Sequence, residues 1–364
     1  MKKCIERIGV LTAGGDCPGL NAVLRAVTKT AIYKHGIEVI GFKDGYDGLV
    51  KDNYTVLNNR DVSGILPLGG TILGTSNIAN PYKYCVKKNN KFVSRNMSEQ
   101  AISNYRRHRL DALITIGGDG TLATALKLSR DGLNIVGVPK TIDNDLSATA
   151  YTFGFETAVV TATEAIDKLH STAQSHHRAM LLEVMGRYAG WIALYSGIAG
   201  GGDVILIPEI PYDIKKICKK LEERQRSGKR FSIIVVAEGA RPKGGKMTVS
   251  RIVARSHDKI RLGGVAYKIG ADIERIMGIV TRTTVLGHVQ RGGSPTPFDR
   301  ILATRFGCAA LDLILKRKFG RMVALRNEKI TDVEIAKAVG KLKLVPKNNF
   351  LIKSSKYMGI SFGE

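Results

Sequence analysis

The sequence of 364 residues lacks long apolar runs and a recognisable export signal. Its longest apolar stretches, residues 179–185 and 232–237, are far shorter than the roughly 20 residues of a transmembrane helix. The first residues run straight into a strand-like segment and a glycine turn, without the apolar core or cleavage site of a secretory signal. We therefore expect a cytoplasmic protein that does not span a membrane.

Cysteine is scarce and scattered along the chain. The five cysteines are odd in number and form no CxxC pair, so neither a disulfide framework nor a zinc site is indicated, and a reducing compartment is expected. Internal repeats, low-complexity segments and linkers rich in proline or serine are also missing. The length suits two domains, which ordinary short connections must then join.

Acidic residues are few relative to basic ones, with 32 Asp and Glu against 56 Lys and Arg, a net charge of +24. Such a charge attracts anions, among them phosphorylated metabolites, nucleotides, nucleic acid and acidic lipid. Aromatic side chains do not interleave with the basic runs as base stacking requires. The basic run at 215–230 has the spacing of a solvated amphipathic helix. General attraction of anions is expected, without a specific nucleic-acid partner.

The chain does contain short β-branched runs that alternate with longer helical patterns. This alternation predicts an α/β fold of two doubly wound, mainly parallel sheets with helices on both faces. In such sheets ligands bind beyond the carboxyl ends of the strands. Residues 87–96 are expected to form a mobile surface loop, and the tail beyond residue 350 to fray or dock loosely. The strand-like runs span residues 7–12, 38–42, 112–118, 134–139, 179–185, 203–209, 232–240 and 283–290.

Two glycine-rich loops follow predicted strands. In TAGGDCPGLNA, Gly14 and Gly15 allow backbone N–H groups to approach an anion at a helix N-terminus, or simply form a tight turn. In IGGDGT, Asp119 stands between Gly118 and Gly120, where its carboxylate can hold Mg²⁺ against a polyphosphate. The alternative is that Asp119 caps the helix that follows.

The motif PKTIDND, residues 139–145, combines cationic, hydroxyl and carboxylate side chains. Phosphoryl transfer needs a carboxylate for the acceptor hydroxyl, a metal, and cations around the moving phosphoryl group. Asp143 can accept the hydroxyl proton, and Asp145 can help hold the metal. Thr141 can donate to a phosphoryl oxygen, and Lys140 can neutralise charge. An Asx-rich turn, in which both aspartates bond backbone amides, explains the motif equally well.

Further charged residues follow later strands. Arg187 comes after a Met-Gly turn directly behind a strand, which is a poor context for a surface charge. Arg282, His288 and Arg291 bracket one strand and suit bidentate clamping of a sugar phosphate. Glu238, at a strand end, can accept sugar hydroxyls. Each residue alone has an ordinary structural explanation, but together they indicate a phosphorylated sugar.

Eight motifs, in chain order, resemble the 6-phosphofructokinase family over residues from about 8 to 308. They are GVLTAGGDCPGLNA, GGTILGTSN, IGGDGT, PKTIDND, GFETA, EVMGRYAGW, AEGA and LGHVQRGGSPTPFDR. The resemblance implies a glycolytic kinase that uses ATP and Mg²⁺ to phosphorylate fructose 6-phosphate at its 1-hydroxyl. It also implies an allosteric homotetramer whose active sites are shared between subunits.

The resemblance implies a role for each matching site residue, with Asp143 as the general base. The other members of the catalytic group are Thr141, Arg187 and Lys140. The residues for the nucleotide are Gly15, Asn77, Gly118, Asp119, Gly120 and Thr121, and Asp119 is also the metal ligand. The substrate residues are Thr141, Asp143, Asp145, Arg178, Met185, Gly186, Arg187, Glu238, Arg282, His288 and Arg291. Arg178 and Arg282 are expected to act on the active site of a neighbouring subunit.

The chain is expected to divide into two discontinuous domains. Residues 1–153 and 290–340 form the nucleotide- and Mg²⁺-binding domain in this prediction. Residues 154–289 and 341–364 form the sugar-phosphate-binding domain. The active site is expected in the cleft between the two domains.

Two positions bear on the choice of phosphoryl donor. In this family a glycine at the position of Gly120 goes with ATP, because an aspartate there would intrude on the nucleotide's phosphates. Lys140 is typical of pyrophosphate enzymes, although a mixed subgroup with both residues chiefly uses ATP. A blocked pocket excludes a donor more firmly than one lysine recruits another, so ATP is expected. The alternative is a pyrophosphate-dependent fructose 6-phosphate 1-phosphotransferase, and a remote one is an inactive anion- or nucleic-acid-binding relative.

The sequence departs from the family pattern in two places. Asn77 stands where many relatives have an arginine that touches the ATP phosphates, and Lys140 is expected to supply the missing charge. In the effector site Arg25 matches, but Asn59 and His170 stand where arginines are expected. These replacements predict weak or altered regulation by ADP and phosphoenolpyruvate.

Overall fold

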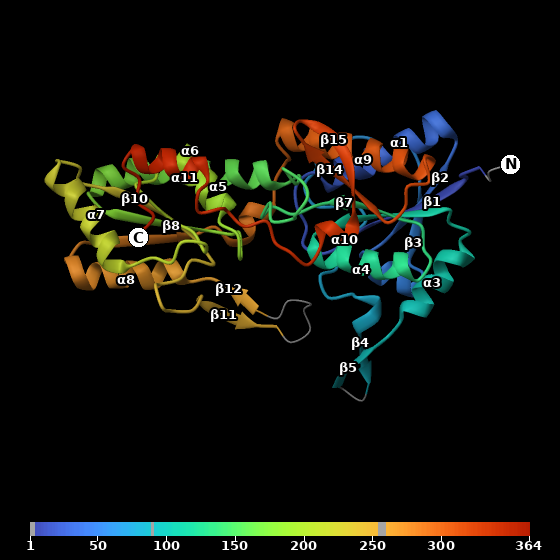
Figure 1. Cartoon of the computed structure of the whole chain (residues 1–364), viewed down its shortest axis with the longest axis horizontal. Coiled ribbons are helices and arrows are strands. Elements are labelled where there is room, and N and C mark those ends of the chain that lie inside the picture. Colours follow the sequence, from blue (N-terminus) through green and yellow to red (C-terminus); the bar gives the residue numbers. More distant parts are fainter. Residues whose placement is uncertain (1–3, 89–90, 254–259) are drawn as a thin grey trace.

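The computed structural model describes residues 4–88, 91–253 and 260–364, and it shows two lobes, each with a large sheet of its own (Figure 1). Both large sheets are mainly parallel and carry helices on their two faces, which confirms the predicted α/β fold. Among the helices that the structure describes, none combines the length and the apolar character that crossing a bilayer requires.

The larger sheet has seven strands in the order β15-β14-β7-β6-β1-β2-β3. The run from β14 to β2 is parallel, and β15 and β3 close the two edges as antiparallel strands. The bounds are β1 (Arg7–Thr12), β2 (Glu38–Phe42), β3 (Tyr54–Leu57), β6 (Ala112–Gly117), β7 (Ile135–Pro139), β14 (Arg321–Arg326) and β15 (Lys329–Glu334).

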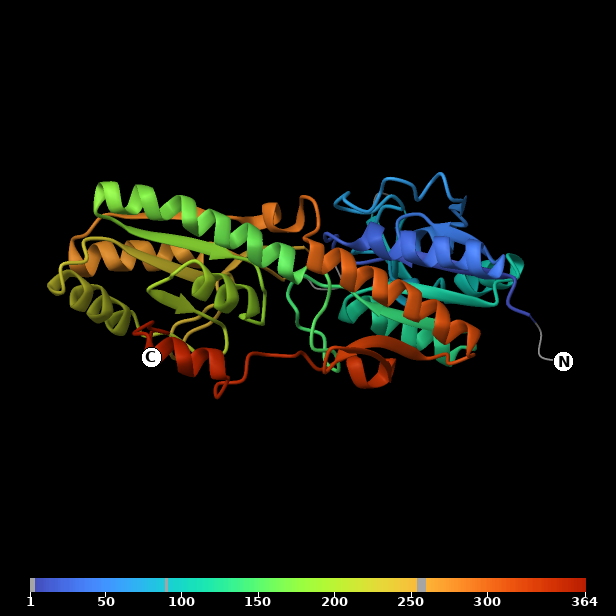
Figure 2. The same ribbon diagram turned by 90° about the horizontal axis from the view of Figure 1, so that it is seen from above.

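Helices cover both faces of this sheet. One face carries α1 (Leu20–His35) and α9 (Pro297–Leu315), which lie side by side (Figure 2). The opposite face carries α2 (Tyr46–Lys51), α3 (Ser98–Arg107), α4 (Asp119–Arg130) and α10 (Ile335–Ala338). Successive residues of β6 therefore enter different cores, Leu113 that of α4 and Ile114 that of α1. Such burial on both faces explains why the strands read as continuous apolar runs.

The smaller sheet has four parallel strands in the order β13-β8-β10-β9. Their bounds are β8 (Ala179–Val184), β9 (Val204–Leu206), β10 (Ser232–Ala237) and β13 (Thr281–Val285). One face packs against α5 (Phe155–His176) and α6 (Trp191–Ala199), and the other against α7 (Ile214–Arg226) and α8 (Val265–Met277). The basic run at 215–230 is the amphipathic helix predicted from its spacing, because α7 buries Ile217 and Leu221.

Each expected strand-like run overlaps a strand of the structure, but the prediction of a loop at residues 87–96 was wrong, and of the two alternatives for the tail the structure excludes fraying. Residues 87–96 are not a loop: they lie in an antiparallel hairpin of β4 (Tyr84–Lys88) and β5 (Lys91–Arg95), although residues 89–90 lie outside the described residues. The tail does not fray, because α11 (Phe350–Tyr357) buries Ile352 against the smaller lobe and Phe362 is buried as well. A second hairpin, β11 (Val249–Ile252) with β12 (Ile260–Leu262), projects from the smaller lobe on the same side as β4 and β5 (Figure 1).

Candidate active site

A cleft of about 710 Å³ lies where the carboxyl ends of the strands of the two sheets face one another. The residues predicted for the site that line it are Gly15, Asn77, Gly118, Asp119, Gly120, Thr121, Lys140, Thr141, Asp143, Asp145, Met185, Arg187, Glu238, His288 and Arg291. Loops that follow β1, β6 and β7 in one lobe and β8, β10 and β13 in the other supply most of them. The fold thus brings together motifs that are far apart in the sequence.

Three of the predicted residues do not line this cleft. Gly186 lies between two lining residues and forms their turn, since its φ is 135° and an added Cβ would stand 2.6 Å from the carbonyl oxygen of Ala189. Arg178 precedes β8, and Arg282 lies at the amino end of β13 opposite Met180 of β8.

His288 and Arg291, in contrast, follow the carboxyl end of β13 in a 3-10 turn, Gly287–Arg291. Within a single chain, the length of β13 therefore separates Arg282 from these two residues. Whether Arg178 and Arg282 serve a neighbouring subunit stays a prediction.

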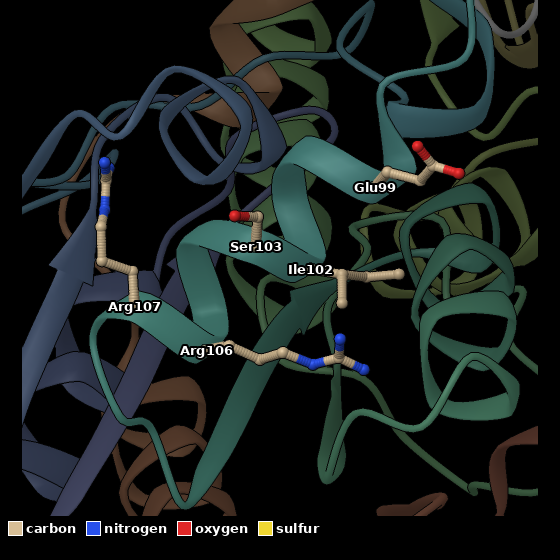
Figure 3. Close-up of a pocket in the computed structure, with 5 residues that line it drawn as sticks. All are labelled: Glu99, Ile102, Ser103, Arg106 and Arg107. Carbon is tan, nitrogen blue, oxygen red and sulfur yellow. The ribbon is translucent and has the colours of Figure 1, made fainter.

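A smaller pocket of about 480 Å³ lies on the outer side of α3 (Figure 3). Its side chains leave the helix in different directions, and Arg107 pairs with Asp52 rather than facing Arg106. The pocket therefore gathers no set of groups that converge on one ligand, and the cleft between the sheets is the candidate active site.

Two cations converge on the glycine loop after β1. The ammonium of Lys140 donates to the carbonyl oxygen of Gly15, and Arg291 Nη1 donates to the carbonyl oxygen of Asp16 at 3.1 Å. A Cβ on Gly15 would stand 2.6 Å from Arg291 Nη1, so only glycine leaves the guanidinium in place. Burial lowers the pKa of Lys140, which is 4% exposed. A tight turn alone does not require two such cations, and their presence favours the anion-binding alternative.

Asp119 is the first residue of α4, and Gly118 occupies the N-cap position without any side-chain cap. The carboxylate of Asp119 does not cap the helix, because its Oδ1 accepts the backbone N–H of Gly340 at 2.7 Å. The capping alternative is therefore wrong. A helix N-terminus without a side-chain cap faces the cleft there, and its N–H groups suit an anion.

Asp143 carries an orphaned polar atom at the centre of the cleft. Its Oδ1 is buried and finds no hydrogen-bond partner among the described residues, while its backbone N–H donates to Thr141 Oγ1 at 3.1 Å. The Asx-turn alternative does not explain this free oxygen. The turn is instead made by Asn144, whose φ is 50° and whose Oδ1 accepts the backbone N–H of Thr152. Burial, and next to it the charge of Asp143, raises the pKa of Asp145 to about 7.

A carboxylate and an arginine lie on the opposite wall of the cleft. The backbone N–H of Arg187 donates to Glu238 Oε1 at 3.1 Å, and Arg187 itself has a left-handed φ of 52°. Burial, followed by the charge of Asp143, raises the pKa of Glu238 to about 7. A carboxyl group with such a pKa both accepts and donates hydrogen bonds near neutrality, which suits sugar hydroxyls.

The described residues fit a divalent cation that arrives with a nucleotide. They contain no group of three or more His, Cys, Asp or Glu side chains that would hold a metal unaided. Mg²⁺ keeps several waters and is commonly bound through one or two carboxylates together with substrate phosphates. Asp119 and Asp143 line the same cleft and offer that kind of partial coordination.

The sequence reasoning missed residues that shape the walls of the cleft. Gln290, which is fully buried, accepts the backbone N–H of Met185 at 2.6 Å and so fixes the loop that follows β8. Glu183 accepts the N–H groups of Gly264 and Ala266 at the start of α8. The sequence contained a feature that could have identified each residue. Gln290 lies inside the motif LGHVQRGGSPTPFDR, and Glu183 is an acidic residue within an otherwise apolar strand.

Comparison with known proteins agrees with the geometry of the cleft. The family model described as Phosphofructokinase matches residues 7–314. The chain belongs to the phosphofructokinase family. A relative from Clostridium perfringens named ATP-dependent 6-phosphofructokinase 2 is 54% identical over 366 residues, which cover 100% of each chain.

Solved structures show the same architecture. Phosphofructokinase from Pichia pastoris in the T-state has a TM-score of 0.80 at 32% identity, over 93% of this chain and 36% of that longer chain. The pyrophosphate-dependent phosphofructokinase from Nitrosospira multiformis has a TM-score of 0.81 at 21% identity, over 98% of this chain and 92% of that chain. The second likeness concerns the fold alone.

Proposed function

We propose that this chain is an ATP-dependent 6-phosphofructokinase, which transfers the γ-phosphoryl group of ATP to the 1-hydroxyl of fructose 6-phosphate. The observation that carries the proposal is the buried, unpaired Oδ1 of Asp143. A carboxylate oxygen kept without a partner is costly unless a ligand supplies one. Asp143 lines a cleft whose other lining residues include Gly15 of the cationic glycine loop and Glu238.

Asp143 is the general base in this proposal. As the oxygen of the 1-hydroxyl forms its bond to the γ-phosphorus, the proton passes to Asp143 and the bond to the bridging oxygen of ATP breaks, which releases ADP. Thr141 and Arg187 hold the transferring phosphoryl group, and Lys140 offsets the charge beside Gly15. Mg²⁺, bound through Asp119 and the phosphates, would neutralise charge on the β- and γ-oxygens.

The sugar phosphate would lie on the smaller lobe. Met185, Gly186 and Glu238 hold the sugar in this proposal, and His288 with Arg291 holds the 6-phosphate. Arg178 and Arg282 would complete the phosphate site of a neighbouring subunit, which makes the working enzyme a homotetramer. Their place beyond the single-chain cleft agrees with such sharing.

The proposal assigns the two halves of the cleft to two domains. Residues 1–153 and 290–340, which hold all strands of the larger sheet, would bind nucleotide and Mg²⁺. Residues 154–289 and 341–364, which hold those of the smaller sheet, would bind the sugar phosphate. We propose a cytoplasmic location, where both substrates of glycolysis are available.

ATP is the proposed donor because Gly120 leaves the N-terminus of α4 without a side chain at that position. The name of the Clostridium perfringens relative supports this choice. One observation favours pyrophosphate as the alternative, namely the buried ammonium of Lys140 on the loop where donor phosphates would lie.

The experiment that decides between the donors measures fructose 1,6-bisphosphate formed from fructose 6-phosphate and Mg²⁺ with ATP or with pyrophosphate. Turnover with ATP alone is the expected result. Turnover with pyrophosphate alone would overturn the choice of donor, and activity with neither would overturn the proposed function.

A further inference from the structure

A segment near the C-terminus crosses from the larger lobe to the smaller one (Figure 2). On its way it contacts the loop after β7 that carries Asp143 and Asp145, called the catalytic loop below. This C-terminal strap, residues 339–345, joins α10 to the region before α11 (Figure 2). Gly340 and Leu342 line the cleft, although no motif of the sequence pointed to them. The proposed chemistry gives these two residues no role.

The strap bonds to both acidic loops of the cleft. The backbone N–H of Gly340 holds Asp119 Oδ1 at 2.7 Å, as described above. Leu342 forms an antiparallel bridge with Leu146, and the backbone N–H of Lys343 donates to the carbonyl oxygen of Asp145 at 2.7 Å. The strap therefore touches the backbone of the catalytic loop immediately after its second aspartate.

The ammonium group of Lys343 uses all three of its hydrogens on this loop. It donates to Asn144 Oδ1 at 2.8 Å, to the carbonyl oxygen of Ala150 at 2.8 Å and to that of Thr149 at 3.1 Å. Since an ammonium group has three donors, its hydrogen-bonding capacity is filled. Asn144 is the residue between the two aspartates, and its Oδ1, which also accepts the N–H of Thr152, ties its left-handed turn to the rest of the loop.

The other end of the strap is fixed to the smaller lobe. Trp191 Nε1 donates to the carbonyl oxygen of Lys343 at 2.7 Å, and the ammonium lies 5.7 Å from the centroid of the indole ring. The backbone N–H of Val345 donates to Glu209 Oε1, which also accepts the N–H of Gly190. Trp191 lies just beyond the loop that carries Met185 and Arg187, and Glu209 binds Gly190 beside it, so one segment joins the two halves of the cleft.

We propose that Lys343 is a positioning residue for phosphoryl transfer, because its ammonium clamps Asn144 and thereby holds Asp143 with its free oxygen toward the substrate. The inference rests on the proposed function of the same cleft. Without the clamp, the turn relaxes and the carboxylate of Asp143 can find a partner in the protein. A misplacement of about 1 Å costs roughly 100-fold in the rate of the chemical step.

The test compares Lys343→Met with Lys341→Met, a matched change on the same strap at an exposed lysine. For Lys343→Met we expect kcat to fall by about 100-fold while the KM values for fructose 6-phosphate and ATP stay within threefold and Tm within a few degrees. Lys341→Met is expected to keep kcat. An unchanged kcat in Lys343→Met, or equal losses in both variants, would overturn the proposal.

Asn144→Gly tests the same contact by removing the acceptor, Asn144 Oδ1, in place of the donor. Glycine tolerates the φ of 50° while removing the carboxamide, so this variant keeps the assay decisive even if Lys343→Met does not fold. We expect a kcat loss of similar size, and a loss in the double variant well below the product of the two single losses, because the two side chains share the bond from Lys343 Nζ to Asn144 Oδ1. Losses that multiply in the double variant would refute the clamp.

Trp191 provides a readout that does not depend on catalysis, since it is the only tryptophan in the chain. Lys343→Met is expected to shift the emission of Trp191, and Lys341→Met to leave it unchanged. If the wild-type protein fails to phosphorylate fructose 6-phosphate, the proposed function fails, while the emission shift still reports whether Lys343 holds the strap. If Lys343→Met leaves both the emission and kcat unchanged in an enzyme that phosphorylates fructose 6-phosphate, the clamp is overturned and the proposed function stands.

Discussion

Glu238→Gln should stabilise the free enzyme at alkaline pH and weaken its activity. Burial and the nearby charge of Asp143 raise the pKa of Glu238 from 4.5 to about 7. The folded enzyme therefore holds this proton more tightly than the unfolded chain, and the stability that results is fully present below pH 4.5 and lost as the pH rises through 7. Glutamine removes the charge but keeps an oxygen for the N–H of Arg187.

The size of this effect follows from the difference between the two pKa values, 2.5 units (7 − 4.5). At about 1.4 kcal/mol per unit, the charged carboxylate costs about 3 kcal/mol at pH 8.5, and about 1 kcal/mol at pH 5.5. With an unfolding entropy of about 2 cal/mol/K per residue, 3 kcal/mol corresponds to a rise in Tm of about 4 °C for a chain of this length.

Calorimetry of wild-type and Glu238→Gln proteins without substrates, at pH 5.5 and 8.5, measures this difference. Glu223→Gln, an exposed change on α7, is the control and should shift Tm equally little at both values. The kcat/KM for fructose 6-phosphate should fall about tenfold in Glu238→Gln, as the loss of one hydrogen bond to a charged group predicts. A Tm difference that does not grow with pH would refute the reasoning about burial.

Two further substitutions test the glycine loop. Lys140→Gly should lower kcat by roughly 100-fold and change the KM for fructose 6-phosphate little, since the ammonium lies against Gly15 on the donor side. Steady-state kinetics with each substrate varied measures both constants. An unchanged kcat would contradict the role of Lys140 in offsetting charge at the transferring phosphoryl group. Gly15→Ala places a Cβ 2.6 Å from Arg291 Nη1, so the guanidinium must move. The KM for fructose 6-phosphate should rise about tenfold with Tm nearly unchanged, and a KM within twofold of wild type would show that Arg291 does not bind the sugar phosphate.

The fold was predictable because its strands are buried on both faces and read as apolar runs that end in glycine-rich loops. The cleft was predictable because those loops follow the carboxyl ends of parallel strands. The hairpin at residues 84–95 was not recognised, since β5 is exposed along its whole length and its sequence shows no apolar alternation. For the tail, the sequence left fraying and loose docking as alternatives, because the apolar residues between Phe350 and Phe362 do not show what they pack against.

No motif or pattern in the sequence predicts that residues 339–345 contact the catalytic loop. Lys343 is one of many lysines in a basic chain, and only the tertiary structure distinguishes it by three hydrogen bonds to the turn at Asn144. Arg282 lies at the amino end of β13, whereas His288 and Arg291 follow its carboxyl end, a separation that spacing alone does not show. Spacing along the chain shows that residues bracket a strand, but a strand separates its two ends in space.

The most direct test of the account is the formation of fructose 1,6-bisphosphate from fructose 6-phosphate and ATP with Mg²⁺, by wild-type protein and by Asp143→Asn purified in parallel. The account predicts robust turnover by the wild type. It predicts a kcat lower by about 100- to 10,000-fold in Asp143→Asn, with the KM for fructose 6-phosphate little changed, because only the proton acceptor is lost. A kcat within a few-fold of wild type in Asp143→Asn would contradict the central claim that the unpaired carboxylate of Asp143 performs the chemistry.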